Sequence, residues 1–415
     1  MTSKVEILSP VGSYESLYSA INAGADSIYF GAGNLNMRSR SSYNFSIKDI
    51  ERVVQICNKN KVNSYLALNT VIYDDELTEV EKILHSAKYA GITAVIASDM
   101  AVIMKAYSMG LSVHISVQAN VSNIGSVRFF AQFANVMVMA RELSLKQIKD
   151  IVDAVNGVNG NPILGPNGKP VKIEVFTHGA LCVSVSGKCY MSLAQYNSSA
   201  NRGACFQNCR RSYRVIDETD GSELVIDNKY VMSPKDICLI RYLDQLLEAG
   251  VTILKLEGRG RAADYVHTVT KVYREAVDAI NNNEYTKDRI DKWEEELSTV
   301  FNRGFWHGGY YMGKSFDMWS DQPDNKAIKK KVRIGVITNF FSKINIAEIT
   351  LKEGDLSLDD EIVIIGSTTG TVKLTVKEIR LDYQKVNKAQ KGAIISIPVD
   401  VKVRRNDQVY ILTTT

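Results

Sequence analysis

Four cysteines stand close together in the middle of the chain and could bind a metal. Cys182, Cys189, Cys205 and Cys209 lie within 28 residues and follow the spacing C-x6-C-x15-C-x3-C. Four thiolates on one segment suit either a tetrahedral zinc ion or an iron–sulfur cluster. Zinc ribbons usually present two tight C-x2-C pairs, and only Cys205 and Cys209 approach that spacing, so the pattern favours a cluster. Zinc and unligated thiols remain alternatives.

Polar side chains on two predicted strands could do acid–base chemistry. Glu174 and His178 belong to the run IEVFTHG at 173–179, and their like parity allows both to face the same side. They are either an acid–base pair or a buried polar pair that fixes the neighbouring segment. His114 and Gln118 share one face of another strand by the same alternation. A polar stripe inside an apolar sheet is unfavourable unless it meets a ligand or water, which predicts a pocket there.

A second set of residues could hold an anion. Arg141 ends one predicted strand, and Lys255, Glu257 and Arg259 end another. These cations could clamp a carboxylate or a phosphate, and arginine can do so with two parallel hydrogen bonds. The alternative is an internal ion pair such as Arg141 with Glu257. Two arginines near the start of the chain could reach the same place: Arg38 and Arg40.

The elements that carry these residues alternate regularly. Short β-rich runs are separated by amphipathic helical stretches with apolar residues at i, i+3 and i+4. Eight such units predict a closed (βα)8 barrel of the TIM type, an α/β fold. An open doubly wound sheet is the rival, and it lacks support because no G-x-G-x-x-G follows the first run. The eight runs are 5–9, 27–31, 64–69, 94–98, 112–117, 136–141, 173–179 and 252–258.

The alternation is interrupted once, between the seventh and eighth runs. The cysteine-rich insertion at 180–250 follows the carboxyl end of a barrel strand, where barrel enzymes keep their active sites. We therefore predict a barrel domain at 1–300 that includes this insertion. A Gly- and aromatic-rich irregular segment with a basic linker follows at 301–331. Six short alternating runs then predict a small antiparallel β-barrel domain at 332–415.

Composition sets broad limits. The 415 residues are 45% hydrophobic and 23% charged, which is ordinary for a globular protein, and the formal net charge is +4. A weakly basic balance permits a polyanionic partner without requiring one. The N-terminus has no apolar core of signal-peptide length, and no run is long enough for a membrane span. We therefore expect a cytoplasmic protein that does not contact a membrane.

The cysteine segment also resembles a family motif. The pattern E-x-F-x2-G-[SA]-[LIVM]-C-x4-G-x-C-x-[LIVM]-S is that of the collagenase-like peptidases of unassigned catalytic type (peptidase family U, number thirty-two). The resemblance extends to the segments at 6–31, 140–145 and 255–278 and to the C-terminal domain. The residues that fill the motif are Glu174, Phe176, Gly179, Ala180, Leu181, Cys182, Gly187, Cys189, Met191 and Ser192.

Despite the family name, the resemblance implies hydroxylation chemistry. Members include oxygen-independent hydroxylation proteins that act on RNA or in ubiquinone assembly, and several bind a four-iron cluster. The length and the β-domain look most like the branch that makes 5-hydroxyuridine in tRNA, with prephenate as co-substrate and the wobble uridine as target. The resemblance implies Cys182, Cys189 and Cys205 as cluster ligands, with Cys209 or Cys238 as the fourth, and we favour Cys209. It implies no oligomeric state.

Two rival functions remain at this point. One is a peptidase, although no H-E-x-x-H and no histidine with an evident nucleophile partner can be found. The other is a non-enzymatic RNA-binding or assembly factor whose cysteines hold zinc. For RNA, the predicted surface combines cations with a neighbouring aromatic ring. Its residues are Arg202, Arg210, Arg211, Tyr213 and Arg214, together with Lys329, Lys330, Lys331, Arg404 and Arg405.

Overall fold

The N-terminal part of the chain is a closed parallel barrel. The computed structural model describes residues 4–40, 44–185, 188–214, 216–223, 232–313, 318–320 and 325–415. Each barrel strand pairs in parallel with the next along the chain, and the last closes the ring by pairing with both the first and the seventh. This confirms the predicted (βα)8 fold. The strands are β1 (Glu6–Pro10), β2 (Ser27–Gly31), β3 (Asn63–Leu68), β4 (Ala94–Ala97), β5 (Val113–Ile115), β6 (Val136–Val138), β7 (Lys172–Gly179) and β9 (Ile253–Leu256).

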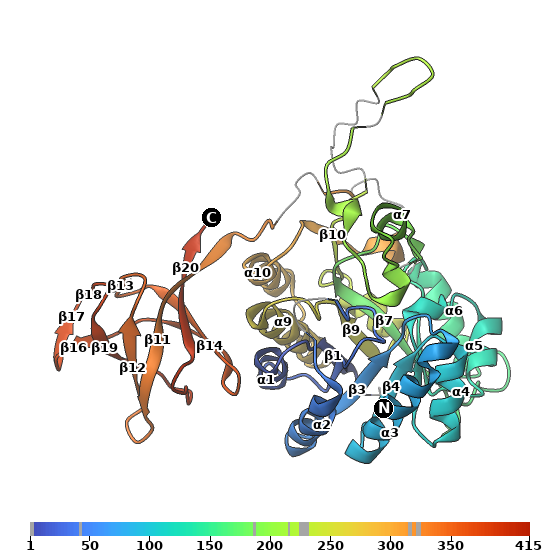
Figure 1. Ribbon diagram of the computed structural model, residues 1–415, viewed down its shortest axis with the longest axis horizontal. Helices are drawn as coiled ribbons and strands as arrows, with labels where there is room; N and C mark the ends of the chain where they lie inside the picture. The colour runs from blue at the N-terminus through green and yellow to red at the C-terminus, as the bar shows by residue number, and fades with distance from the viewer. Residues whose placement is uncertain are drawn as a thin grey trace.

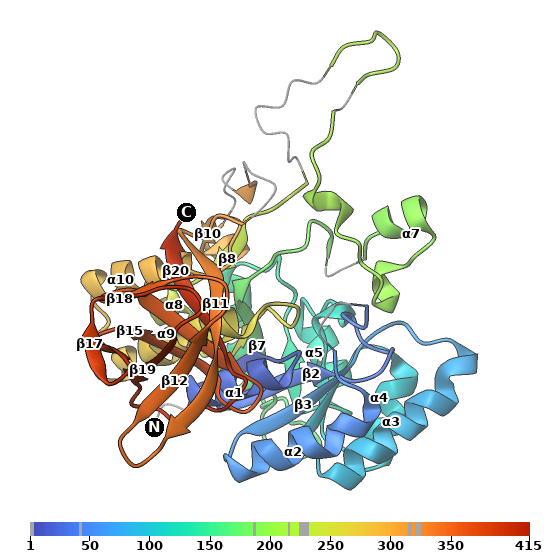
Figure 2. The same ribbon diagram turned by 60° about the vertical axis from the view of Figure 1, so that its left-hand side comes forward.

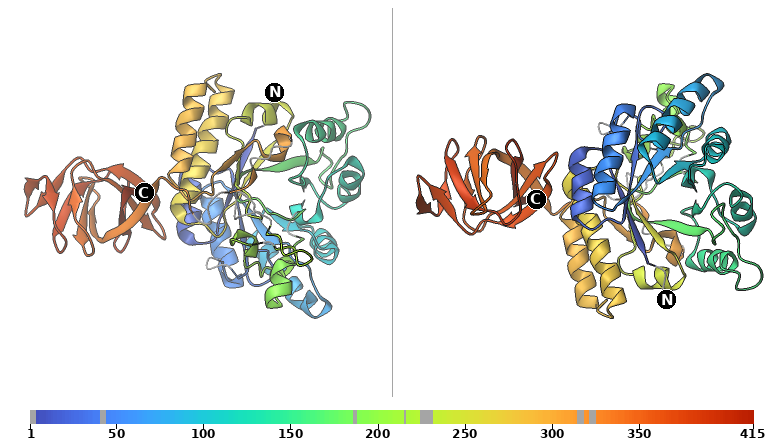
Figure 3. Two further views of the ribbon diagram at one scale, coloured as in Figure 1. Left: turned by 90° about the horizontal axis from the view of Figure 1, so that it is seen from above. Right: turned by 90° about the horizontal axis from the view of Figure 1, so that it is seen from below.

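Amphipathic helices surround the barrel because each buries one apolar face against the strands (Figure 3). Polar caps begin several of them: the side chain of Asp99, for example, accepts a hydrogen bond from the Ala101 amide at the start of α4. None of the described helices is long and apolar enough to cross a membrane. The helices around the barrel are α1 (Tyr14–Asn22), α2 (Ile50–Lys59), α3 (Leu77–Ala90), α4 (Met100–Ser108), α5 (Ile124–Phe130), α6 (Leu145–Val155), α8 (Leu243–Glu248), α9 (Ala263–Asn281) and α10 (Lys287–Ser298).

Two further strands extend the barrel sheet, one from the insertion and one from the segment at 301–331. β8 (Asp236–Cys238) runs antiparallel to the last residues of β7, and β10 (Phe305–His307) pairs with β8. The structure therefore places a strand in the segment that we predicted to be irregular. The cysteine-bearing part contains the short helix α7 (Met191–Tyr196), which lies beyond the barrel strands in Figure 2. Gly187 of the motif lies outside the described residues.

The C-terminal part is an antiparallel β-domain with a core of its own. Its main sheet follows the order β15-β14-β20-β11-β12-β19-β16-β17, and a second sheet pairs β13 with β18. β11 begins at Lys329, so most of the predicted basic linker belongs to a strand. The strands are β11 (Lys329–Phe341), β12 (Ile346–Leu351), β13 (Leu356–Ser357), β14 (Glu361–Gly366), β15 (Gly370–Thr375), β16 (Ile379–Leu381), β17 (Gln384–Val386), β18 (Lys388–Ala389), β19 (Ile394–Pro398) and β20 (Gln408–Thr414).

The β-domain docks on the outside of the barrel, against α1 and α9 (Figure 1). The Ser19 hydroxyl of α1 donates a hydrogen bond to the Thr371 hydroxyl at 2.9 Å. The Lys331 ammonium forms an ion pair with Asp264 of α9 at 2.6 Å. Gly370 lies so close to α1 that a Cβ atom there would be 2.9 Å from the Ser19 nitrogen. The barrel and the β-domain therefore meet through specific polar contacts and close backbone packing.

Candidate functional site

A pocket of about 440 Å³ lies at the carboxyl ends of the barrel strands. Its floor comes from residues on or just after β2, β3, β4, β5, β6, β7 and β9, and its walls come from the cysteine-rich insertion. This volume is within the range of pockets that bind small molecules. Eleven of the predicted site residues line it: Arg38, Arg40, Gln118, Arg141, Cys182, Cys189, Cys205, Cys209, Lys255, Glu257 and Arg259.

Four thiols share one wall of this pocket. Burial raises the pKa of the Cys209 thiol; Arg210 partly opposes this rise, and the nearby Cys182, Cys205 and Cys189 add to it. The Met191 amide donates a hydrogen bond to the Cys189 sulfur at 3.4 Å. The number and chemistry of these donors fit an iron–sulfur cluster or a zinc ion. Within the described ranges, no three His, Cys, Asp or Glu side chains are grouped at the spacing of a metal site.

Cys238 does not line the pocket. It is fully buried on β8, and burial raises the pKa of its thiol to about 12. Its neighbours on the sheet are His178 of β7 and His307 of β10. Of the two residues considered for the fourth ligand position, Cys209 lines the same pocket as the other three thiols, whereas Cys238 lies in the core.

Cations dominate the charge of the pocket. Among the residues that the structure describes, one lysine and six arginines line it, against a single carboxylate, Glu257. The guanidinium of Arg141 lies 4.4 Å from the centre of the Phe176 ring and donates to the Ala180 carbonyl, while its Nε has no hydrogen-bond partner. A half-buried, incompletely bonded guanidinium beside a cavity is suited to receive an anion. The cationic residues are Arg38, Arg40, Arg141, Arg210, Lys255, Arg259 and Arg261.

Glu257 is held by groups other than Arg141. Its carboxylate accepts hydrogen bonds from Arg38 at 3.0 Å and from the Tyr29 hydroxyl at 3.2 Å. Burial alone would raise the pKa of Glu257, but Arg38, Arg141 and Arg259 together hold it below the usual value. The alternative of a direct Arg141–Glu257 ion pair is therefore not what the structure contains. The Nε of Arg141 is left without a hydrogen-bond partner among the described residues.

Beneath the pocket, Lys255 joins a buried polar group inside the barrel. Its ammonium donates to Glu174 at 2.6 Å and lies 4.4 Å from the centre of the Tyr29 ring. The other oxygen of Glu174 has no hydrogen bond and lies 3.8 Å from Nδ1 of His114. Burial and then the charges of Lys255 and Lys172 lower the pKa of His114 to about 3. Glu174 and His114 therefore support Lys255 from below without lining the pocket.

His178 faces the opposite way from Glu174. The pairing of β7 with β9 shifts register between Phe176 and His178, which reverses the alternation of side chains. The His178 ring packs outside the barrel, with ring centroids 5.5 Å from Tyr273 and 5.7 Å from Phe305. Burial lowers its pKa to about 3. The expectation that both residues face one side is wrong because of this bulge.

Comparison with known proteins identifies the family. The model of Peptidase family U32 matches residues 12–321. The chain is 49% identical over 405 residues to a protein named collagenase from Porphyromonas gingivalis (strain ATCC BAA-308 / W83), covering 98% of this chain and 97% of that protein. This chain belongs to peptidase family U32.

Other relatives of this U32 protein carry different names. It is 31% identical to tRNA hydroxylation protein P1 of Bacillus subtilis (strain 168), covering 73% of this chain and 70% of that protein. It is 34% identical to a 23S rRNA 5-hydroxycytidine synthase of Escherichia coli (strain K12), covering 67% of this chain and 40% of that protein. The family as matched here therefore includes both collagenase-named proteins and RNA hydroxylation proteins.

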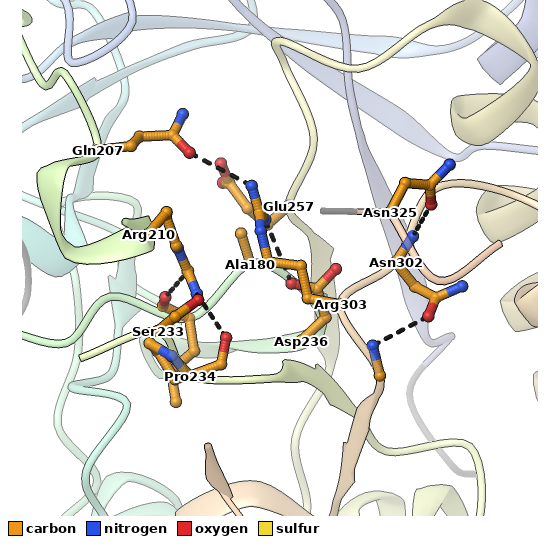
Figure 4. Close-up of polar contacts among 12 residues, drawn as sticks. Ala180, Gln207, Arg210, Ser233, Pro234, Asp236, Glu257, Asn302, Arg303 and Asn325 are labelled. Carbon is orange, nitrogen blue, oxygen red and sulfur yellow. Dashed lines mark hydrogen bonds and ion pairs between the residues drawn. The ribbon is translucent and has the colours of Figure 1, made fainter. Parts of the chain in front are cut away.

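The sequence prediction for Arg210 in this U32 protein requires correction. Its guanidinium is directed inward and donates to the Leu181 carbonyl at 2.6 Å, to the Ser233 hydroxyl at 3.2 Å and to the Pro234 carbonyl (Figure 4). Arg210 thus ties the segment before Cys182 to the strand region of β8. It is a positioning residue of the insertion and not a free phosphate ligand.

Several other cations of the predicted RNA surface are paired within the chain. Arg202 binds Glu76, Arg214 binds Glu223 and Lys331 binds Asp264. Sequence reasoning also missed the buried pair of Asp236 and Arg303, 3.7 Å apart near Gln207 (Figure 4). Arg303 lies in the segment predicted to be irregular, where no periodicity marks a buried residue.

Proposed function

We propose that this chain is an RNA-modifying enzyme that hydroxylates C5 of the wobble uridine of tRNA without molecular oxygen. It would use an iron–sulfur cluster of the 4Fe-4S type and a small dicarboxylate co-substrate, prephenate. The proposal rests on one observation above all: four thiols and a cationic floor line the same pocket at the mouth of the barrel. The two RNA hydroxylation relatives support the choice of substrate class.

The cysteines of the pocket supply the ligands in this proposal. Cys182, Cys189, Cys205 and Cys209 would hold the cluster, which supplies electron transfer or Lewis-acid chemistry when bound. The Met191 amide donates a hydrogen bond to the Cys189 sulfur, and the Arg210 guanidinium lies close enough to Cys209 and Cys182 to interact with their sulfurs electrostatically. Hydrogen bonds and positive charge near cluster sulfurs also tune its reduction potential.

The cationic floor is suited to the dicarboxylate. Arg141 offers an unbonded Nε, Lys255 lies near the carboxyl end of β9, and Arg259 follows that strand. Two carboxylates need two separate cationic partners, and a single lysine would not orient both. Gln118, which follows β5, adds an amide that can donate to or accept from a polar substrate group.

The pocket also suits a nucleotide base that is unpaired or flipped out of its helix. C5 of a uridine inside a helix is hard to reach, so an enzyme acting there takes an unpaired or flipped nucleotide. The pocket is bordered by Phe176 and Phe206, whose rings can contact a base, and by cations that can contact its phosphates. The anticodon loop of a tRNA offers both unpaired bases and phosphates.

A peptidase is the second candidate, because the collagenase-named relative covers nearly the whole chain. Nucleophilic proteolysis needs a base beside the nucleophile. Among the described residues no histidine lines the pocket, and the pKa values of buried His114 and His178 are lowered to about 3. A floor rich in cations suits an anionic substrate better than a neutral peptide bond. These points favour the hydroxylase.

The decisive experiment compares the two activities in one preparation. The full chain is purified anaerobically, and its absorbance near about 400 nm is recorded as a marker of an iron–sulfur chromophore. It is then incubated with unmodified tRNA, with and without prephenate, and separately with denatured collagen. We expect 5-hydroxyuridine that depends on the chromophore and on prephenate. Hydrolysis of collagen by a chromophore-free preparation, with no change in the tRNA, would overturn the proposal.

A further inference from the structure

An exposed aromatic cluster stands on the insertion beside the pocket. Tyr190 is 75% exposed, Phe206 49% and Tyr196 43%. Leu193 lies on the same short helix and is also exposed. Large apolar side chains gathered at one exposed place are typical of interaction sites. We call these four residues the aromatic platform.

The platform has a defined shape. Tyr190, Leu193 and Tyr196 are spaced by three residues along α7 and its first flanking position, so neighbouring side chains emerge on one side. Phe206 packs against Tyr196 from the next segment, with ring centroids 5.1 Å apart. The Phe206 amide donates to the Ser192 hydroxyl at 3.0 Å, which fixes this contact to the start of the helix.

The platform continues into the pocket. Phe206 belongs to the pocket wall together with its neighbours Cys205 and Gln207, while its ring is half exposed. A ligand seated in the pocket can therefore extend over Phe206 onto Tyr196. Figure 2 shows α7 to one side of the barrel, beyond the ends of the strands. The aromatic platform is therefore positioned to contact the part of a long substrate that remains outside the pocket.

The charge around the platform identifies the kind of partner. Residues 182–214 contain one lysine and four arginines and no aspartate or glutamate. Arg202 and Arg214 are paired with carboxylates elsewhere in the chain and Arg210 is turned inward, so Arg211 is the arginine that the platform itself offers. Arg211 is exposed, and its guanidinium lies 5.7 Å from the centre of the Tyr196 ring. An apolar peptide would gain nothing from this charge. A polyanion with exposed planar groups would use both the rings and the cations.

We propose that the aromatic platform stacks unpaired nucleotides of an RNA loop that flank the base entering the pocket. The inference rests on the proposed function and adds the contact surface for the rest of the loop. Duplex RNA hides the faces of its bases, whereas every unpaired base offers one for stacking. The platform thus selects single-stranded loops by structure more than by sequence.

The test is a titration with two RNA probes across salt concentrations. One probe is a synthetic anticodon stem–loop, and the other is a fully paired, two-stranded RNA duplex with the same number of nucleotides. The double variant Y196A/F206A should bind the stem–loop at least about tenfold more weakly, with unchanged affinity for the duplex. The slope of log affinity against log salt should stay the same, because no charge is removed. Replacing Arg211 by Gln should instead lower that slope by about 0.7.

Two control variants separate stacking from folding. Tyr89→Ala removes an 85% exposed tyrosine from the last turn of α3, which precedes β4 and so lies at the barrel end opposite the pocket. It should bind both probes as the wild type does. Phe206→Trp keeps an aromatic face and should retain stem–loop binding.

The possible outcomes separate the platform from the proposed function. Unchanged stem–loop binding by Y196A/F206A would overturn the platform even if the wild type hydroxylates tRNA. Equal loss for both probes would also contradict it, because stacking would not be the cause. A wild type that binds neither probe would overturn the inference together with the RNA substrate. If the wild type were a dimer and the double variant a monomer that still binds RNA, the aromatic platform would be assigned to contact with a second copy of the chain.

Discussion

Arg210 and Arg211 are neighbours in the chain and have opposite surroundings. Arg210 is turned inward and donates to two carbonyls and a hydroxyl, whereas Arg211 is exposed beside Tyr196. Sequence alone groups both as RNA-binding cations, because a run of charge does not reveal which side chain finds internal acceptors. Because only Arg211 is exposed, we expect this pair of arginines to make one phosphate contact.

The fourth ligand can be decided at the level of single cysteines. We predict that Cys209→Ser lowers the iron bound per chain after anaerobic purification to a small fraction of the wild-type value. Cys238→Ala should keep the iron, because its side chain is buried on β8 outside the pocket. It should lower the unfolding free energy by about 1 kcal/mol through the lost core contact. Iron analysis and absorbance spectra check this, and the reverse ranking would contradict our assignment.

His178 gives a pH-dependent prediction. Its folded-state pKa of about 3 lies below the ordinary value near 6.5, so the unfolded chain binds the proton first. Stability from this group is therefore complete above about pH 6.5 and is lost as the pH falls towards 3. Between pH 7 and pH 5 the loss is about 2 kcal/mol.

His178→Phe should remove this loss while keeping a ring against Tyr273 and Phe305. Urea unfolding at both pH values measures it, through the difference between wild type and variant. An identical pH dependence in the two proteins would show that His178 is already protonated or exposed in the native state.

Among the elements, the barrel strands were the most predictable. Their apolar runs are short, β-rich and separated by helical periodicity, and all eight occur where the sequence places them. The bulge between Phe176 and His178 could not be predicted, because alternation in a sequence assumes an unbroken register. β10 and the inward contacts of Arg210 were also missed, since both depend on partners distant in the chain.

The insertion itself should loosen when Arg210 is removed. Arg210→Ala deletes three hydrogen bonds from a charged donor, so the free energy of local opening across 181–214 should fall by about 2 kcal/mol or more. Hydrogen exchange of backbone amides measures this opening. Arg214→Ala is the matched control, because that exposed side chain bonds only to Glu223 within the described structure and should change exchange little. Equal effects of the two variants would mean that Arg210 does not hold the insertion.

At the scale of the whole molecule, the β-domain is fixed to the barrel where no sequence signal predicts contact. Gly370 approaches α1 and has a φ of +73°. Gly370→Ala should therefore strain the backbone. It should also force the two parts to separate, and this second effect should lower the unfolding free energy by about 1–3 kcal/mol in addition to the strain. Hydrogen exchange of α1 and β15 should rise.

Gly392→Ala provides a control for backbone strain. Gly392 also has a positive φ, of +93°, but a Cβ atom there would meet nothing within 4 Å. This variant should show the strain alone and leave exchange in α1 unchanged. If Gly370→Ala behaved in the same way, the contact between β15 and α1 would contribute nothing to the assembly of the two parts.

The central claim joins the cysteine pocket to RNA hydroxylation, and one measurement tests it most directly. Nucleosides from the tRNA of a strain of the source organism that lacks this gene are quantified by mass spectrometry. Complementation uses the wild type, Cys209→Ser and the control Cys57→Ser, which alters a buried thiol of α2 outside the pocket. We predict that 5-hydroxyuridine disappears on deletion and returns with the wild type and Cys57→Ser but not with Cys209→Ser. Unchanged 5-hydroxyuridine in the deletion strain, or full recovery with Cys209→Ser, would contradict the account.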